Sequence, residues 1–209
     1  MKRTSRATRH RTPKGAIGSP RAIDILTGMS RFNVDSWRSR AWSRYQRAQS
    51  RDRGKASDRF VRDILAIPAI EAIDAWCSRQ GLTVNFSRSP NALYHGDEAR
   101  IDVNANLAPE TQMHLMLHEC GHHLIKLDAE RNPSSYAVRY SCVDHTQSKR
   151  GFGSRCDVVD EEFEAWHRGW LLAEQLGLQL DRCRFDNTKK SSLKTYVKWS
   201  LSNSTRDFL

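Results

Sequence analysis

One helix-forming segment near the middle of the chain carries a polar cluster that restricts how the chain can fold. Residues 109–127 begin with a proline, place Glu110 in the first turn and include a long run without β-branched residues, which predicts a helix. This segment contains the sequence His118-Glu119-Cys120-Gly121-His122. Two histidines four residues apart lie one turn apart on one helix face, so both imidazoles can bind a single ion.

The apolar neighbours of this cluster indicate that the helix packs inside a domain. A buried His-Glu-His cluster costs several kcal/mol unless a metal or hydrogen-bond partners satisfy it. We therefore predict that His118 and His122 bind one zinc ion and that Glu119, rotated by about 100° on the helix, lies beside the ion as a general base. The alternative is a hydrogen-bonded pair of core histidines. The apolar neighbours are Met113, Leu117, Leu124 and Ile125.

Two further histidines lie on the same predicted helix. His114 stands one turn before His118 on the same side, which makes it a candidate supporting group or an alternative ligand. His123 projects in another direction, and we expect it to be structural or exposed.

A catalytic zinc site needs a third protein ligand, and the helical pattern of residues 158–176 offers three glutamates. At ~100° per residue, Glu162 falls in the middle of the apolar face of this helix. A lone carboxylate on a buried face needs a cation to remain charged, so Glu162 is the predicted third ligand. Glu161 and Glu164 fall on the polar side, where we expect a solvated face with Glu164 paired to Arg168.

The remaining pattern predicts an α+β domain with a short sheet and an active-site helix. A helix runs from Ser57 or Asp58 towards Gln80, where Gly81 ends it, and Pro68 should break or kink it. The order helix, strand, strand, helix then leads into the motif. The other predicted elements are strands at 82–86 and 100–104 and a packing helix within 189–209.

Charge divides the chain into two parts. Residues 1–57 contain 15 Lys/Arg and 3 Asp/Glu, a net charge of +12. Residues 58–209 contain 19 Lys/Arg and 21 Asp/Glu, a net charge of −2. We interpret residues 1–57 as a basic arm, mostly disordered up to residue 30, with a helix over 33–50. Such an arm suits contact with nucleic acid, or it is a solvated tail. For helix 33–50 we expect one of two roles: its aromatic face docks on the domain, or its arginines contact phosphates.

The composition predicts an intracellular, cytoplasmic protein that does not enter a membrane. No apolar run approaches the ~20 residues needed to span a bilayer, and the basic start lacks the apolar segment of a secretory signal. The five cysteines are odd in number and irregularly spaced, which favours reduced thiols. Cys142, His145 and Cys156 form a partial zinc-like spacing, but we interpret the cysteines as loop or core residues.

These motifs resemble the ImmA/IrrE-like metallopeptidase family over roughly residues 58–180. Trp166 stands where the family has Asn, Asp or Glu. The resemblance implies a small zincin-like α+β domain with one catalytic zinc, and we predict that this domain, with a C-terminal helical tail, spans residues 58–209. Family members often serve phage, plasmid or stress-response regulation by cutting a repressor-type protein, in the host cytoplasm for a phage-encoded member, and some act as regulators without clear peptidase activity. The matching segments are 82–86, 101–104, 117–124 and 162–165.

The resulting functional hypothesis is a zinc-dependent metallopeptidase that hydrolyses an intracellular, regulatory protein. Strand 101–104 is expected to pair with the extended substrate as an edge strand. The alternative is a zinc-stabilised DNA-binding or regulatory protein that uses the basic arm and cuts nothing. An oxyanion stabiliser is also needed, and the candidates are Tyr136, Tyr140, His145 and His167.

Overall fold

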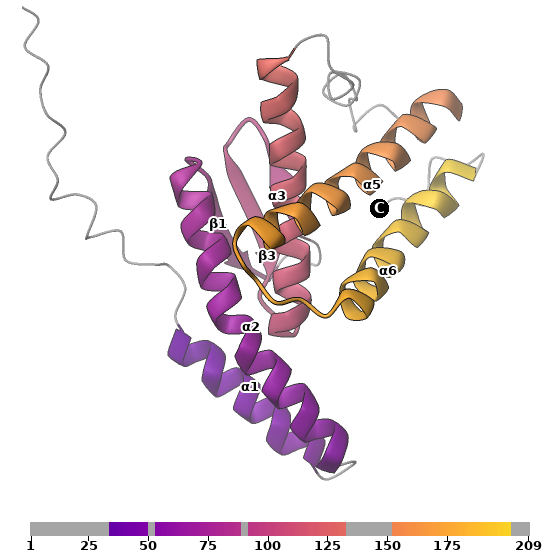
Figure 1. The fold of residues 1–209 in the computed structure, drawn as a ribbon. Helices are drawn as coiled ribbons and strands as arrows, with labels where there is room; N and C mark the ends of the chain where they lie inside the picture. The colour runs from indigo at the N-terminus through magenta and orange to yellow at the C-terminus, as the bar shows by residue number, and fades with distance from the viewer. Residues whose placement is uncertain (1–33, 50–52, 89–91, 133–151, 202–209) are drawn as a thin grey trace, which may run out of the picture. The chain divides into compact units, whose positions relative to one another are not determined.

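The structure is a computed structural model that describes residues 34–49, 53–88, 92–132 and 152–201. These residues form five helices and a three-stranded sheet, which confirms the predicted α+β class (Figure 1). None of the helices in this part of the chain is long and apolar enough to cross a membrane. The helices are α1 (Val34–Gln49), α2 (Arg53–Arg79), α3 (Pro109–Arg131), α5 (Phe152–Gln175) and α6 (Arg182–Leu201), and the strands are β1 (Thr83–Ser87), β2 (Leu93–His95) and β3 (Arg100–Asn104).

The sheet has the order β1-β3-β2, so β3 is its central strand. β1 pairs with β3 in parallel, with Val84 opposite Ile101, and β2 pairs with β3 antiparallel, with Tyr94 opposite Ile101. The prediction that residues 101–104 form an edge strand for a substrate is therefore wrong, because both sides of β3 are already paired. β2 escaped prediction because its three residues lie in a turn-rich stretch just before Gly96.

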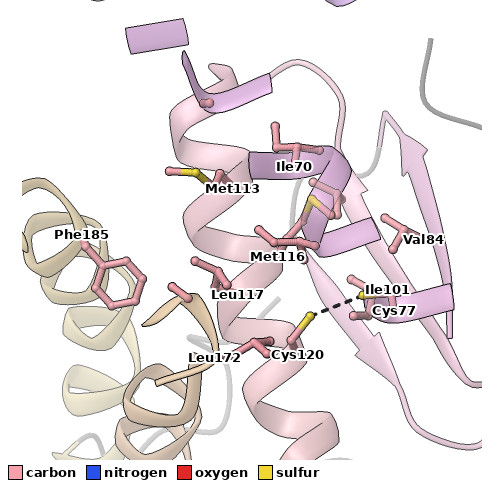
Figure 2. Close-up of a cluster of buried hydrophobic side chains, with 14 of the residues drawn as sticks. Ile70, Cys77, Val84, Ile101, Met113, Met116, Leu117, Cys120, Leu172 and Phe185 are labelled. Atoms are coloured by element: carbon pink, nitrogen blue, oxygen red, sulfur yellow. Dashed lines mark hydrogen bonds between the residues drawn. The ribbon is translucent and has the colours of Figure 1, made fainter. Parts of the chain in front are cut away.

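Helix α3 lies at the centre of the core. α2 and the sheet pack on one side of it, and α5 packs on the other with α6 beside it (Figure 1). Figure 2 shows how α3 directs its apolar side chains into both layers. The buried side chains around it include Ile70 and Cys77 of α2, Val84 and Ile101 of the sheet, Met116, Leu117 and Cys120 of α3, Leu172 of α5 and Phe185 of α6.

Several element boundaries differ from the predictions. α2 begins at Arg53, so the predicted domain boundary between residues 57 and 58 falls inside a helix. α2 also continues through Pro68, since buried residues on both sides, Ile67 and Ile70, hold the helix against the core. α5 begins at Phe152, earlier than the predicted residue 158. The predicted stop at Gly81 is confirmed, because this residue has the left-handed φ of 77° typical of a helix end.

Helices α3 and α5 cross with their backbones in contact. A Cβ atom added to Gly121 would lie 2.0 Å from the carbonyl oxygen of Ala165, and one added to Gly169 would lie 2.5 Å from that of Leu117. Each helix thus contributes one glycine at the point where the other approaches. This crossing brings the motif of α3 against the predicted third-ligand helix.

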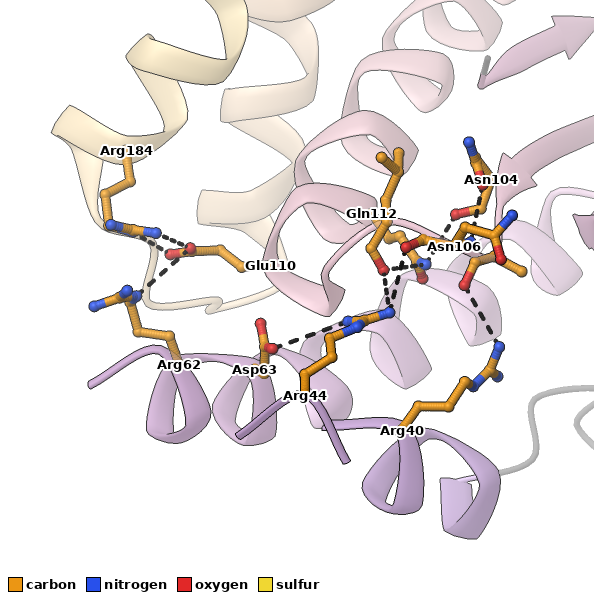
Figure 3. Close-up of polar contacts among 11 residues, drawn as sticks. Arg40, Arg44, Arg62, Asp63, Asn104, Asn106, Glu110, Gln112 and Arg184 are labelled. Atoms are coloured by element: carbon orange, nitrogen blue, oxygen red, sulfur yellow. Dashed lines mark hydrogen bonds and ion pairs between the residues drawn. The ribbon is translucent and has the colours of Figure 1, made fainter. Parts of the chain in front are cut away.

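The predicted helix over 33–50 is confirmed as α1, and it docks on the domain (Figure 3). Arg40 and Arg44 donate to the backbone carbonyls of residues 105–107, which connect β3 to α3. Arg44 Nη1 also lies 4.0 Å from the buried Asp63 carboxylate. Gln112 Nε2 donates at 2.9 Å to the carbonyl of Asn104, the last residue of β3, and to that of Leu107. These two arginines therefore serve docking, whereas residues 1–33 of the predicted arm lie outside the described residues.

Glu110, in the first turn of α3, joins three helices. Its carboxylate accepts a hydrogen bond from Arg184 Nε of α6 at 2.6 Å and lies 3.7 Å from Arg62 Nε of α2 (Figure 3). A carboxylate at this position also interacts favourably with the positive end of the helix dipole. The start of α3 is thereby fixed to both layers around it.

The close crossing predicts the effect of one added methyl group. Gly121→Ala is expected to lower the free energy of unfolding by about 3 kcal/mol or more, because the methyl group would overlap a backbone carbonyl of α5. Urea denaturation of the metal-free protein measures this change. Gly153→Ala in α5 is the matched control, since its added Cβ meets nothing within 4 Å, and it is expected to cost nothing or to stabilise by up to ~1 kcal/mol. Equal stability of the two variants would contradict the backbone contact.

Candidate metal centre

The crossing of α3 and α5 brings His118, His122 and Glu162 together. The Nε2 atoms of the two histidines lie 3.3 Å apart. Glu162 Oε2 lies 3.1 Å from His118 Nε2, and Glu162 Oε1 lies 3.5 Å from His122 Nε2. The three side chains predicted as ligands therefore meet in one place, although Glu162 follows His122 by 40 residues in the chain.

These separations match those expected for ligand atoms around a single metal ion. Ligand atoms at ~2.0–2.1 Å from a tetrahedral zinc lie about 3.3–3.4 Å from one another, close to the three observed distances. Within the described residues, Glu162 Oε2 has no hydrogen-bond partner, although His118 Nε2 is 3.1 Å away. The ligand-type atoms of the three side chains are therefore directed at one common region.

Glu119 lies beside these atoms. The ligand-type atoms of His118, Glu119 and His122 all lie within 4.8 Å of one another, and Glu119 is only 5% exposed. Burial raises the pKa of Glu119, while a hydrogen bond from the backbone N–H of Tyr94 in β2 acts in the opposite direction. A carboxyl group with a raised pKa, placed next to a metal position, suits a general base.

The charges of the cluster favour a cation. Three carboxylates are buried here, those of Glu119, Glu161 and Glu162, against two imidazoles. Burial acts against the charged form of His122, but Glu161 and Glu162 raise its pKa well above the ordinary value. Burial likewise acts against the charged form of Glu162, but the two histidines hold its pKa well below the usual range. The negative potential of the buried carboxylates favours a proton on His122, and it favours a divalent cation among these side chains in the same way.

Glu161 is not part of a solvated face, and that prediction was wrong. The residue is 8% exposed, and its Oε1 lies 3.1 Å from His122 Nδ1, within hydrogen-bond distance. A carboxylate that accepts the second ring N–H of a histidine fixes the tautomer and leaves Nε2 free to bind a metal. The predicted pair of Glu164 and Arg168 does form, with 2.7 Å between Arg168 Nε and Glu164 Oε1.

On the side of Nδ1, His118 is held by ring stacking. Its ring lies 4.5 Å from the ring of Trp166, centre to centre, with an interplanar angle of 20°. His118 Nδ1 and Trp166 Nε1 are both buried without a hydrogen-bond partner among the described residues. Trp166, where the resemblance predicts Asn, Asp or Glu, therefore orients the ligand through its ring face.

The other histidines of α3 are structural. His114 Nδ1 lies 2.9 Å from Thr188 Oγ1 of α6, and burial lowers the pKa of His114 to about 4. This contact directs His114 to α6, and it is not one of the three converging ligands. His123 is buried, with its Nδ1 3.0 Å from the Tyr94 hydroxyl.

The predicted oxyanion candidates do not reach the cluster within the described residues. His167 is exposed on α5, and Tyr136, Tyr140 and His145 lie outside those residues. A residue missed by the sequence analysis, Tyr196 of α6, does reach it, through a hydrogen bond to Glu162. Its helical spacing with Leu193 and Leu201 was visible in the sequence, but that pattern indicates packing and does not reveal which partner the helix covers.

The cysteines do not extend this centre. Cys77 and Cys120 are buried free thiols whose sulfur atoms lie 3.5 Å apart, and Cys156 and Cys183 are exposed free thiols. Cys142, the first residue of the partial zinc-like spacing, lies outside the described residues.

Comparisons with known protein families, with curated proteins and with solved structures find no match to this chain. The interpretation of the site therefore depends on its own geometry.

The geometry predicts a graded response of zinc content to three glutamate substitutions. Purified wild type is expected to hold one zinc per chain, and Glu162→Ala to hold none, because it removes a ligand. Glu161→Ala is expected to keep the site but to weaken zinc binding by roughly 10–100-fold, since it removes the support of His122. Glu164→Ala is the matched control and should bind as wild type does. Elemental analysis measures the zinc content, and chelator competition measures the zinc affinity. Equal zinc affinities of Glu161→Ala and Glu164→Ala would contradict the role of Glu161.

Proposed function

We propose that this chain is a zinc-dependent metallopeptidase of the ImmA/IrrE-like, zincin type that hydrolyses an intracellular regulatory protein. The observation that carries the proposal is the meeting of His118, His122 and Glu162 at ligand separations, with the buried Glu119 beside them. A purely structural zinc site has no need of a general base, the role that the position of Glu119 suits. The resemblance adds a repressor-type protein as the expected substrate.

The chain's own residues provide the acid–base chemistry of the proposed reaction. Zinc, when bound by His118, His122 and Glu162, polarises the scissile carbonyl and lowers the pKa of a water molecule towards ~7. Glu119 removes a proton from the attacking water and then delivers it to the nitrogen of the leaving amine. The backbone N–H of Tyr94 holds the Glu119 carboxylate in place for both transfers.

The substrate is proposed to lie along β2, not along β3. β2 is an outer strand of the sheet, and the Tyr94 N–H that reaches Glu119 belongs to it. An extended peptide that adds to an outer strand is held by main-chain hydrogen bonds, which suits cleavage of an unfolded segment. Such a peptide would lie next to the general base.

A second candidate function, DNA binding, is supported by the charge of the N-terminal part. Residues 1–33 contain 8 Lys/Arg and 1 Asp/Glu, a net charge of +7. Two arginines of α1, Arg40 and Arg44, serve intramolecular contacts, so the larger share of the remaining positive charge of residues 1–57 lies before α1. Both functions are compatible if the basic residues bring the peptidase to a DNA-bound substrate.

The peptidase proposal predicts the effect of Glu119→Gln. Zinc-loaded wild type is expected to cleave members of an unbiased peptide library, read out by mass spectrometry, and Glu119→Gln to lose about 10²–10⁴-fold in rate because it cannot accept the proton. Zinc content must be equal in the two proteins, since Glu119 is not a ligand. Undiminished cleavage by the zinc-loaded variant would refute this mechanism.

The DNA-binding proposal predicts a salt-dependent affinity that resides in residues 1–33. Full-length protein is expected to bind duplex DNA and to lose roughly 10³-fold in affinity between 50 and 200 mM salt. A deletion that ends at residue 33 is expected to remove this binding. It keeps α1, whereas a deletion through residue 57 would also remove the docked helix and the start of α2. Binding that is absent or insensitive to salt would exclude this role.

A further inference from the structure

Helix α6 turns one polar side chain towards the metal centre. Leu193 and Ser200 are buried, 5% and 7% exposed, and they mark the inward face of α6. Tyr196 stands three residues after the first and four before the second, so it lies on the same face. α6 packs along α5, the helix that carries Glu162 (Figure 1).

The hydroxyl group of Tyr196 contacts the predicted third ligand. It forms a side-chain hydrogen bond with Glu162, and the charges of Glu119 and Glu161 also act on it. The phenol therefore contacts Glu162 and lies within the electrostatic reach of the other two buried carboxylates. A phenol carries its proton at neutral pH. A protonated phenol next to a carboxylate is the hydrogen-bond donor.

Each of the three ligands then has a separate means of orientation. Glu161 lies at hydrogen-bond distance from His122 Nδ1, and Trp166 stacks on the ring of His118. The final torsion of a glutamate side chain is broad, so helix packing alone does not set the plane of its carboxylate. A hydrogen bond from a fixed donor can set that plane, and Tyr196 is in contact with Glu162 to provide it.

We propose that Tyr196 is a positioning residue of the metal centre: its hydroxyl donates to Glu162 and holds that carboxylate in the orientation in which it binds zinc. The inference rests on the zinc site of the proposed function and deepens it. It makes α6 a component of the site. It also extends the site beyond residue 180, where the sequence resemblance ends.

The test measures the affinity of the full chain for zinc alone. Tyr196→Phe removes the hydroxyl and keeps the ring, and it is expected to weaken zinc binding by roughly 10–100-fold in chelator competition. Thr188→Val is the matched control, because it also removes a hydroxyl that joins α6 to α3, at His114, away from the ligands. The control is expected to bind zinc as wild type does. Circular dichroism of the metal-free proteins verifies that both variants are folded.

A double-mutant cycle distinguishes positioning of Glu162 from a general structural role. Glu162→Gln weakens the ligand, and in that background Tyr196→Phe is expected to reduce zinc affinity much less than it does in wild type, because the hydroxyl acts through the Glu162 carboxylate. Substitution with Co²⁺ gives a second readout. The visible absorption of the Co²⁺ protein should change in Tyr196→Phe and stay unchanged in Thr188→Val.

The outcomes separate this inference from the proposed function. Equal zinc affinity of Tyr196→Phe and wild type would overturn the positioning role and leave the peptidase proposal intact. Equal losses in Tyr196→Phe and Thr188→Val, or an undiminished loss in the Glu162→Gln background, would also overturn it. A wild type that binds zinc but cleaves no peptide would defeat the peptidase proposal, while the zinc affinities would still decide the role of Tyr196. A wild type that binds no zinc would overturn both.

Discussion

The backbone contact between α3 and α5 determines the geometry of the candidate metal centre. Gly121 and Gly169 let the two helices approach until an added Cβ would lie 2.0–2.5 Å from a carbonyl oxygen. The predicted ligand atoms of one helix then lie 3.1–3.5 Å from those of the other. Metal–ligand distances tolerate deviations of only about 0.2 Å, so a helix displaced by the thickness of a methyl group could not supply Glu162 at that range. Packing and ligand geometry are thus set by the same two small residues.

The electrostatics of the cluster complement this packing. Three buried carboxylates are costly in a protein interior unless positive charge accompanies them. The histidines supply part of it, which is why the pKa of His122 is raised and that of Glu162 is lowered despite burial. Hydrogen bonding by Glu161, stacking by Trp166 and the hydroxyl of Tyr196 then give each predicted ligand one defined contact. The domain therefore retains polar groups in its core in an arrangement that suits a divalent cation.

Helical periodicity predicted the parts of this site that lie on single helices, and it failed for contacts between elements. The i, i+4 spacing of His118 and His122 and the phase of Glu162 were sufficient to choose three residues that the structure brings together. Glu161 was misjudged because its polar side of α5 faces His122, and one helix's own pattern does not report what lies opposite. The central position of β3 depends on long-range strand pairing, which alternation within a single strand does not encode. Tyr196 escaped notice for the same reason, since its partner is on another helix.

The contribution of α6 also has a consequence for the order of synthesis. His118, His122 and Glu162 have all been translated 34 residues before the ribosome reaches Tyr196. The ribosome encloses the newest few tens of residues of a growing chain, so Glu162 becomes free to pack at about the stage at which Tyr196 is added. The last predicted ligand and the helix that positions it therefore become available for packing together, and α3, with its two imidazoles, is made before both.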